Sequence, residues 1–158
     1  MAGRITGQLL RRLGKLDESL RILEYVLPIA KRHRLIKEVK YTLTAIAVVY
    51  SLKAEYDKAL KYNFECLTIR AMEGNKKDIS ISLMNIGVIY FKIDNFSLAL
   101  DYYLRSLNAK RASGDQYDLD RLLINIGICY IYLTKYDLAH ENINEAIVKD
   151  IELFEENN

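Results

Sequence analysis

The chain has 158 residues, of which 51% are hydrophobic and 28% are charged. This composition is typical of a globular protein and argues against a disordered chain. Its 23 Lys and Arg against 21 Asp and Glu leave a net charge of +2, so no polyanionic partner is required. Two Cys and two His are too few for a disulfide framework or a structural zinc site. No apolar run of about 18 residues occurs, so we expect no membrane insertion by this segment.

Charge is unevenly distributed along the chain. Residues 1–40 carry ten Lys and Arg against four Asp and Glu, whereas residues 121–158 carry three against seven. The chain is therefore basic at its start and acidic at its end. In an elongated molecule this gradient would be a long electric dipole.

The sequence repeats itself with a period of about 40 residues, which is typical of a stacked repeat architecture. The segment Asn85–Tyr90, which reads NIGVIY, aligns with Asn125–Tyr130, which reads NIGICY, and Ala45–Tyr50 lies one period earlier. One repeat cannot bury its apolar face alone, so consecutive repeats must stack on one another. We therefore expect a single domain over 1–158 built of four repeats: 1–35 (degenerate), 36–75, 76–115 and 116–156.

Each repeat has the apolar spacing of two helices. In the third repeat, residues 83–90 and 96–107 place apolar side chains at i, i+3, i+4 and i+7. Gly74 and Gly114 are helix-ending signals at the same position of consecutive repeats. The pattern predicts antiparallel helix pairs, with helices over 3–13, 17–33, 36–53, 57–73, 77–93, 97–112, 118–133 and 137–155.

Three small or rigid residues make specific demands on the packing. Gly87 and Gly127 lie in the middle of predicted helices, where Gly is about 1 kcal/mol less favourable than Ala. We expect a neighbouring helix to approach them closely, opposite Ala99 and Ala139. Pro28 falls inside the second predicted helix and should kink or interrupt it. The first repeat should therefore be the least regular.

Small and aromatic residues at fixed positions carry a family resemblance. They are Gly87, Tyr90, Phe96, Ala99 and Tyr103, repeated by Gly127, Tyr130, Tyr136 and Ala139. This pattern resembles the tetratricopeptide repeat, in the long form of kinesin light chains, Leu-Gly-Asn repeat adaptors and bacterial peptide-pheromone receptors. Residues 82–115 are similar in style to sensor regions of bacterial, Bacteroidetes-type, histidine kinases and regulators. The consensus Pro that ends the second helix is absent, and Ala71, Arg111 and Ile151 occupy its column.

The resemblance implies an all-α fold, a right-handed superhelix of four antiparallel helix pairs (an α-solenoid), with a concave groove lined by the first helix of each pair. Groove columns carried over by position are Tyr41, Thr44, Ala45, Val48, Ile81, Met84, Asn85, Val88, Lys92, Arg121, Ile124, Asn125, Ile128 and Tyr132. Asn85 and Asn125 share a column, and two amides in register could bracket the backbone of an extended peptide. Two alternatives stay open: the Asn side chains could serve local structure, and the apolar residues could contact a neighbouring helix or the C-terminal segment.

The family's carboxylate clamp, which grips chaperone C-termini, is not matched. Asn85 and Arg121 are suitable in type, but Thr44, Val48 and Asn125 are not. We therefore expect a different ligand.

Isolated features imitate catalytic or metal chemistry without completing it. They are the pair Asp137 and His140, the pair Glu141 and Glu145, and the thiols Cys66 and Cys129. A metal would need a second carboxylate–histidine pair, the two glutamates lie in an acidic and solvated segment, and the thiols fall on apolar columns. The sequence therefore predicts no enzyme activity, no cofactor and no metal.

Three functional hypotheses follow. The first is a protein- or peptide-binding scaffold, the sensory or regulatory part of a larger cytoplasmic signalling protein, or a periplasmic one if this is an excised sensor region. The start inside a weak repeat and the polar end at Glu155–Asn158 suggest such a segment. The second is head-to-tail self-association of a basic first repeat with an acidic last repeat. The third, a nucleic-acid site at the basic residues 31–40, is disfavoured because no aromatic residues are interleaved there.

Overall fold

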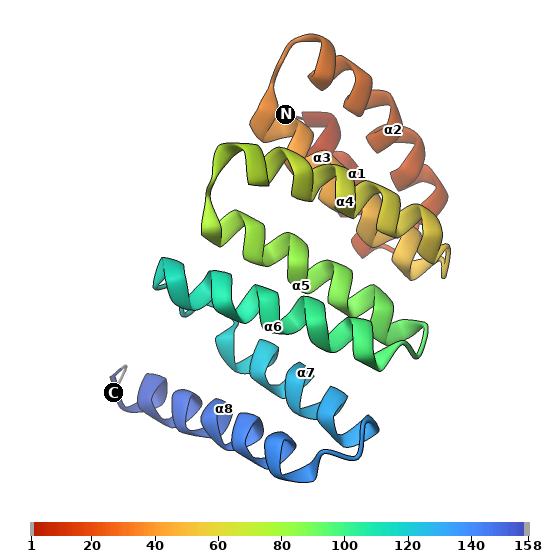
Figure 1. Ribbon diagram of the computed structural model, residues 1–158. Helices are drawn as coiled ribbons and strands as arrows, with labels where there is room; N and C mark the ends of the chain where they lie inside the picture. The colour runs from red at the N-terminus through yellow and green to blue at the C-terminus, as the bar shows by residue number, and fades with distance from the viewer. Residues whose placement is uncertain (1, 157–158) are drawn as a thin grey trace. The chain divides into compact units, whose positions relative to one another are not determined.

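The structure is a computed structural model that describes residues 2–156, and in that range it is helical throughout, without strands (Figure 1). The helices are α1 (Ala2–Arg12), α2 (Leu16–Arg32), α3 (Ile36–Leu52), α4 (Tyr56–Glu73), α5 (Lys76–Lys92), α6 (Phe96–Ser113), α7 (Leu119–Tyr132) and α8 (Tyr136–Glu156). Each predicted helix is present, and each end lies within one residue of its prediction. The ends of the predicted domain, residue 1 and residues 157–158, lie outside the described residues.

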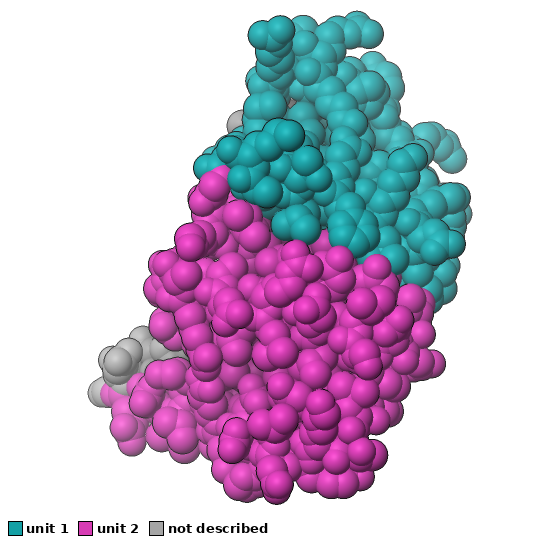
Figure 2. All heavy atoms as spheres, viewed as in Figure 1, with its two compact units in different colours: residues 1–73 teal, residues 74–158 magenta. Residues whose placement is uncertain are grey.

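The helices form two compact units, which Figure 2 shows in different colours. Unit 1 is residues 1–73 and unit 2 is residues 74–158. Each contains two antiparallel helix pairs: α1 with α2 and α3 with α4 in unit 1, α5 with α6 and α7 with α8 in unit 2. Within each unit the second helix of one pair packs against the first helix of the next, so stacked pairs bury the core.

Tight turns with a left-handed residue end the helices at repeating positions. Gly74 and Gly114 have φ of +70° and +68°, which Gly adopts without steric penalty. The turn inside each helix pair also contains a left-handed residue, at a different position that recurs once per repeat. Asp94 and Thr134 occupy this position, with φ of +59° and +58°. The turn geometry therefore follows the repeat period even where Gly is missing.

The two mid-helix glycines allow close approach of paired helices, as predicted. A Cβ on Gly87 would lie 2.6 Å from the ring of Tyr103 and 3.2 Å from the carbonyl oxygen of Ala99. A Cβ on Gly127 would lie 2.6 Å from Cγ1 of Ile143 and 3.2 Å from the carbonyl oxygen of Ala139. The close packing of α5 against α6, and of α7 against α8, therefore requires a residue without a side chain at these two positions.

Of the two effects predicted for Pro28, a kink or an interruption, the interruption does not occur. Helix α2 continues through Pro28 to Arg32. The Pro28 ring is exposed, and Leu23, Leu27 and Ala30 on the opposite side of the helix are buried in unit 1. Their burial holds the helix together although the backbone N–H of residue 28 is missing.

Candidate functional site

The two groove asparagines lie on equivalent helices of unit 2. Asn85 is on α5, Asn125 is on α7, and both side chains are half-buried. Within residues 2–156 neither side-chain amide has a hydrogen bond. By contrast, Asn142 on α8 donates from Nδ2 to the carbonyl oxygen of Leu138, 2.8 Å away, which is the local bond that a structural role would use. The donors and acceptors of Asn85 and Asn125 are therefore available to a ligand.

The apolar residues beside the two asparagines divide between core and surface. Met84 is buried in a cluster formed with residues of α6 and α7, and Val88 packs against the same cluster. Ile124 is exposed and Ile128 is half-buried on α7. Met84 therefore contributes to the interior of unit 2, and α7 presents more apolar surface than α5.

The polar and aromatic candidates of unit 2 lie near the helix ends. Lys92 is exposed at the end of α5 and makes no ion pair with a described residue. Arg121 donates from Nη2 to Oδ2 of Asp118 at 2.7 Å. The ring of Tyr132 stacks on that of Phe96, with centroids 4.1 Å apart. Lys92 is thus an available cation, whereas Tyr132 is already committed to an aromatic contact.

The candidates Thr44 and Val48 belong to unit 1. Thr44 donates from Oγ1 to the carbonyl oxygen of Lys40 at 3.0 Å and accepts from Nη2 of Arg70 at 3.3 Å. Val48 is half-buried one turn later on α3. The Thr44 hydroxyl is therefore engaged inside unit 1.

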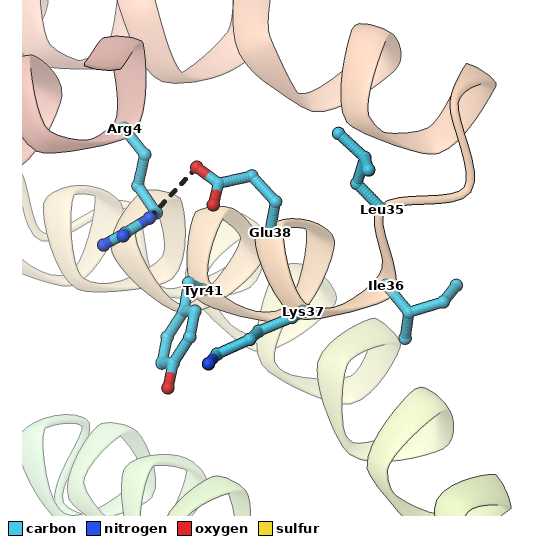
Figure 3. Close-up of a pocket in the computed structure, with 6 residues that line it drawn as sticks. All are labelled: Arg4, Leu35, Ile36, Lys37, Glu38 and Tyr41. Atoms are coloured by element: carbon cyan, nitrogen blue, oxygen red, sulfur yellow. Dashed lines mark hydrogen bonds and ion pairs between the residues drawn. The ribbon is translucent and has the colours of Figure 1, made fainter. Parts of the chain in front are cut away.

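A hollow of about 670 Å³ opens in unit 1 beside α1 and the start of α3 (Figure 3). It is lined by Arg4, Leu35, Ile36, Lys37, Glu38 and Tyr41. Arg4 donates from Nε to Oε1 of Glu38 at 3.0 Å, and its guanidinium carbon lies 5.1 Å from the ring centroid of Tyr41. The groove columns expected from the sequence included Tyr41 but not Arg4, because Arg4 lies in the degenerate repeat.

The Arg4–Glu38 pair could have been predicted from the sequence, because ion pairs between consecutive repeats recur at one sequence separation. Arg4 and Glu38 are 34 positions apart, and two other ion pairs that join consecutive repeats have the same separation. Lys31 Nζ on α2 lies 2.5 Å from Oε1 of Glu65 on α4, and Arg111 Nη2 on α6 lies 2.8 Å from Oε1 of Glu145 on α8. The last two pairs occupy the same columns two repeats apart.

The features that imitate active-site chemistry have other contacts. Glu145 accepts from Arg111 rather than sharing a proton with Glu141, and a ring nitrogen of His140 lies 3.2 Å from Nδ2 of Asn144. Cys66 and Cys129 are free thiols and are both buried. Burial raises the pKa of Cys129 to about 11, which makes it a poor nucleophile at neutral pH.

The basic stretch at residues 31–40 is partly neutralised inside unit 1. Lys31 pairs with Glu65, and Lys40 Nζ lies 2.5 Å from Oε2 of Glu73. Arg32 remains exposed on the surface. The stretch therefore presents less positive charge than its sequence indicates.

Comparison with known proteins agrees with this geometry. Residues 78–147 match the family model of the tetratricopeptide repeat. Residues 78–147 therefore carry tetratricopeptide repeats. No curated protein matches the sequence.

Solved structures share the tetratricopeptide fold. BtubC (BKLC) from P. vanneervenii has a TM-score of 0.88 at 19% identity, over 96% of this chain and 63% of that chain. The TPR-like repeats of a putative kinesin light chain from Podosopora anserina give 0.80 at 11%, over 96% and 74%. A Rap protein complexed with Competence and Sporulation Factor gives 0.83 at 16%, over 92% and 41%. The chain thus spans less than two thirds of BtubC and of the Rap protein.

None of the helices within residues 2–156 combines the length and the apolar character needed to cross a bilayer.

Proposed function

We propose that this tetratricopeptide chain is a non-enzymatic scaffold whose α5 and α7 hold an extended peptide or protein segment. The pair Asn85 and Asn125 carries this proposal, because their half-buried amides have no hydrogen bond within residues 2–156. A side-chain amide both donates and accepts, so each can bind one peptide group of an extended ligand. Two such amides on successive repeats would fix the ligand's backbone without reading its side chains.

Apolar side chains and a cation beside the asparagines would supply the rest of the binding energy. Val88 and Ile128 follow the two asparagines by three residues and are half-buried, and Lys92 follows Val88 by one turn. Because the helices are formed before binding, little ordering of the scaffold opposes association. The occupant that fits is an extended segment with small apolar side chains and one acidic group.

We place this scaffold in the sensory or regulatory part of a larger signalling protein. The Rap protein with the same fold was solved with Competence and Sporulation Factor bound, and this chain corresponds to 41% of it. The predicted likeness to bacterial sensor kinases and regulators points in the same direction. Regulation would then consist of ligand occupancy on α5 and α7.

Selection from a random peptide library tests the proposal. The purified chain is immobilised, peptides displayed on phage are selected, and an enriched peptide is labelled for fluorescence anisotropy. We expect Asn85→Ala and Asn125→Ala each to raise its Kd about tenfold, because each removes one bidentate peptide contact. Asn108→Ala, on the exposed surface of α6, is the matched control and should leave the Kd unchanged.

The same variants separate a binding role from a structural one. An unbonded mid-helix Asn is a poorer helix former than Ala, so each groove variant should be more stable by about 0.5 kcal/mol. A loss of stability in either variant would show that its amide supports the fold. Failure to enrich any peptide, or equal loss of affinity in Asn108→Ala, would contradict the proposal.

A further inference from the structure

The first and last helices of the chain both expose apolar side chains. Along α1 and the residue that follows it, Ile5, Leu9 and Leu13 recur at every fourth position and are all exposed. On α8, Ile147 and Ile151 are 51% and 52% exposed. Terminal repeats of a solenoid normally carry a polar outer face, because nothing stacks on them. We therefore expect another structure to cover each of these two surfaces.

The repeat register shows which kind of structure fits on α8. Leu107 is the counterpart of Ile147 one period earlier, and it is only 4% exposed because α7 covers it in the core of unit 2. Met84 is likewise buried there, whereas its counterpart Ile124 on α7 is exposed. Ile147 and Ile124, which the last repeat exposes, thus correspond to residues that the third repeat buries under another helix pair. A further pair of the same type fits on α7 and α8.

Helix α1 has the pattern of such a covering helix. Leu9 lies three periods before Cys129, which is fully buried where α7 packs against α6. Leu13 lies three periods before Leu133, which packs against the same cluster. Leu9 and Leu13, which are exposed in unit 1, therefore correspond to residues of α7 and of the turn after it that pack into the core of unit 2.

The ion-pair columns that join consecutive repeats identify a specific contact across this junction. Lys31 with Glu65 and Arg111 with Glu145 join the second helices of consecutive repeats. One repeat (40 residues) after Arg111, the position of the cation in these pairs is occupied by Ile151. One step before Glu65 the carboxylate column holds Tyr25, which is 72% exposed on α2. Stacking the first repeat of one copy on the last repeat of another would place Tyr25 against Ile151, an apolar contact at the position where Lys31–Glu65 and Arg111–Glu145 form ion pairs. One period on from Lys31 and Glu65 the same columns hold Ala71 and Arg105, so the ion pair does not recur in every repeat.

A second column agrees with this register. Phe96 and Tyr132 stack where the third repeat meets the fourth. Their counterparts at the junction are Tyr136, exposed at the start of α8, and Arg12 at the end of α1. A guanidinium stacks well on an aromatic face, so this replacement preserves the contact.

We infer that a second copy of this chain docks head to tail, with α1 and α2 of one copy covering α7 and α8 of the next. The excess of Lys and Arg in residues 1–40 and of Asp and Glu in residues 121–158 gives the first and last repeats opposite net charges, which favours their association. The interface is heterologous, so it generates rings or open chains rather than a closed two-fold dimer.

A charge-insertion experiment tests the register as well as the association. Sedimentation velocity over a range of concentrations gives the association constant of the wild-type chain. Tyr25→Glu and Ile151→Lys should each weaken it severalfold, because each replaces an apolar contact at the junction with an unpaired charge that stays partly exposed, as in the equivalent ion pairs. The double variant Tyr25→Glu/Ile151→Lys recreates the Glu65–Lys31 type of pair across the junction and should recover wild-type association.

Matched controls keep the outcome interpretable. Tyr117→Glu makes the same change at a residue 73% exposed outside both surfaces, and Met72→Lys does so for the introduced cation. Both controls should associate like the wild type, and circular dichroism melts confirm folding of every variant. Any of three results would overturn the inference. They are a wild-type chain that stays monomeric, single variants that associate like the wild type, and a double variant whose association is not restored. A monomer would assign the two surfaces to other segments of a longer protein.

Discussion

The ammonium of Lys110 on α6 lies 2.9 Å from Oδ2 of Asp115, and both side chains are buried. Lys77 on α5 lies 2.9 Å from the other carboxylate oxygen, Oδ1. Lys110 also donates to the backbone carbonyl of Tyr117 in the connection to α7. One buried carboxylate thus joins the start of α5, the end of α6 and the connection that leads into the last repeat.

Removing the charge of Asp115 should destabilise the chain strongly. In Asp115→Asn the buried Lys110 loses its counter-ion, and breaking a buried pair in this way typically costs about 3 kcal/mol. Urea denaturation measures the loss. Asp101→Asn is the matched control, because its pair with Arg105 is exposed on α6 and should contribute less than about 0.5 kcal/mol. Equal effects of the two substitutions would contradict a structural role for the Lys110 pair.

The same carboxylate should make the protein acid-sensitive. Burial alone would raise the pKa of Asp115, but hydrogen bonds from Lys110 and Lys77 outweigh it and hold the pKa below its ordinary value of 3.8. Asp115 therefore stabilises the fold fully above that ordinary value, and the contribution is lost as the pH falls toward its lowered pKa. Melting temperatures should fall below about pH 4 more steeply in the wild type than in Asp115→Asn. Parallel pH profiles would show that Asp115 titrates normally in the native state.

Filling the space at Gly87 should destabilise the helix pair α5–α6. The Cβ of Gly87→Ala would meet the ring of Tyr103, which is fully buried and has no space to move. Overpacking of about 1–3 kcal/mol should exceed the gain of about 1 kcal/mol in helix propensity. Gly127→Ala is the control, because its Cβ meets Ile143, which is only half-buried and can shift toward solvent. Thermal denaturation should rank Gly87→Ala below Gly127→Ala, and the reverse order would contradict this explanation.

Most of the fold was predictable because the repeat period constrains every element several times. A helix end that is ambiguous in one repeat is clear in another, as the helix-ending residues Gly74 and Gly114 show. Each predicted helix end therefore lies within one residue of the end in the structure. Pro28 misled the prediction because its tolerance depends on an exposed ring, which local sequence does not reveal. Lys110 was missed because a lysine in a helix normally indicates a solvated surface.

The candidate site was predictable only in part. The shared column placed Asn85 and Asn125 on equivalent helices of unit 2, and the structure shows that their amides are unbonded within residues 2–156. Met84 is predicted to line the groove but is buried, because apolar residues on the core side and the groove side of a helix have the same spacing. Arg4 was missed because its repeat is degenerate, and its partner Glu38 is distant in sequence.

Relieving backbone strain at Thr134 should stabilise the turn between α7 and α8. Thr134 has φ of +58°, a region that is strained for a β-branched residue. Thr134→Gly should raise the free energy of unfolding by about 1 kcal/mol, because relief of strain exceeds the added entropy of the unfolded chain. Chemical denaturation measures the gain. Thr68→Gly, in the interior of α4, is the opposite control and should lose stability. A loss in Thr134→Gly would show that the turn is held by other contacts.

Cys129 should react with thiol reagents only when unit 2 opens. Its side chain is fully buried against α6, and burial raises its pKa to about 11, so neither access nor ionisation favours reaction near neutral pH. In a Cys66→Ala background, labelling by a maleimide should be slow in the native protein and should accelerate with urea in parallel with unfolding. An added surface thiol at Tyr117 (Tyr117→Cys) supplies the fast reference rate, because that side chain is exposed. If Cys129 were labelled as fast as this reference without urea, α7 could not pack against α6 as the structure shows.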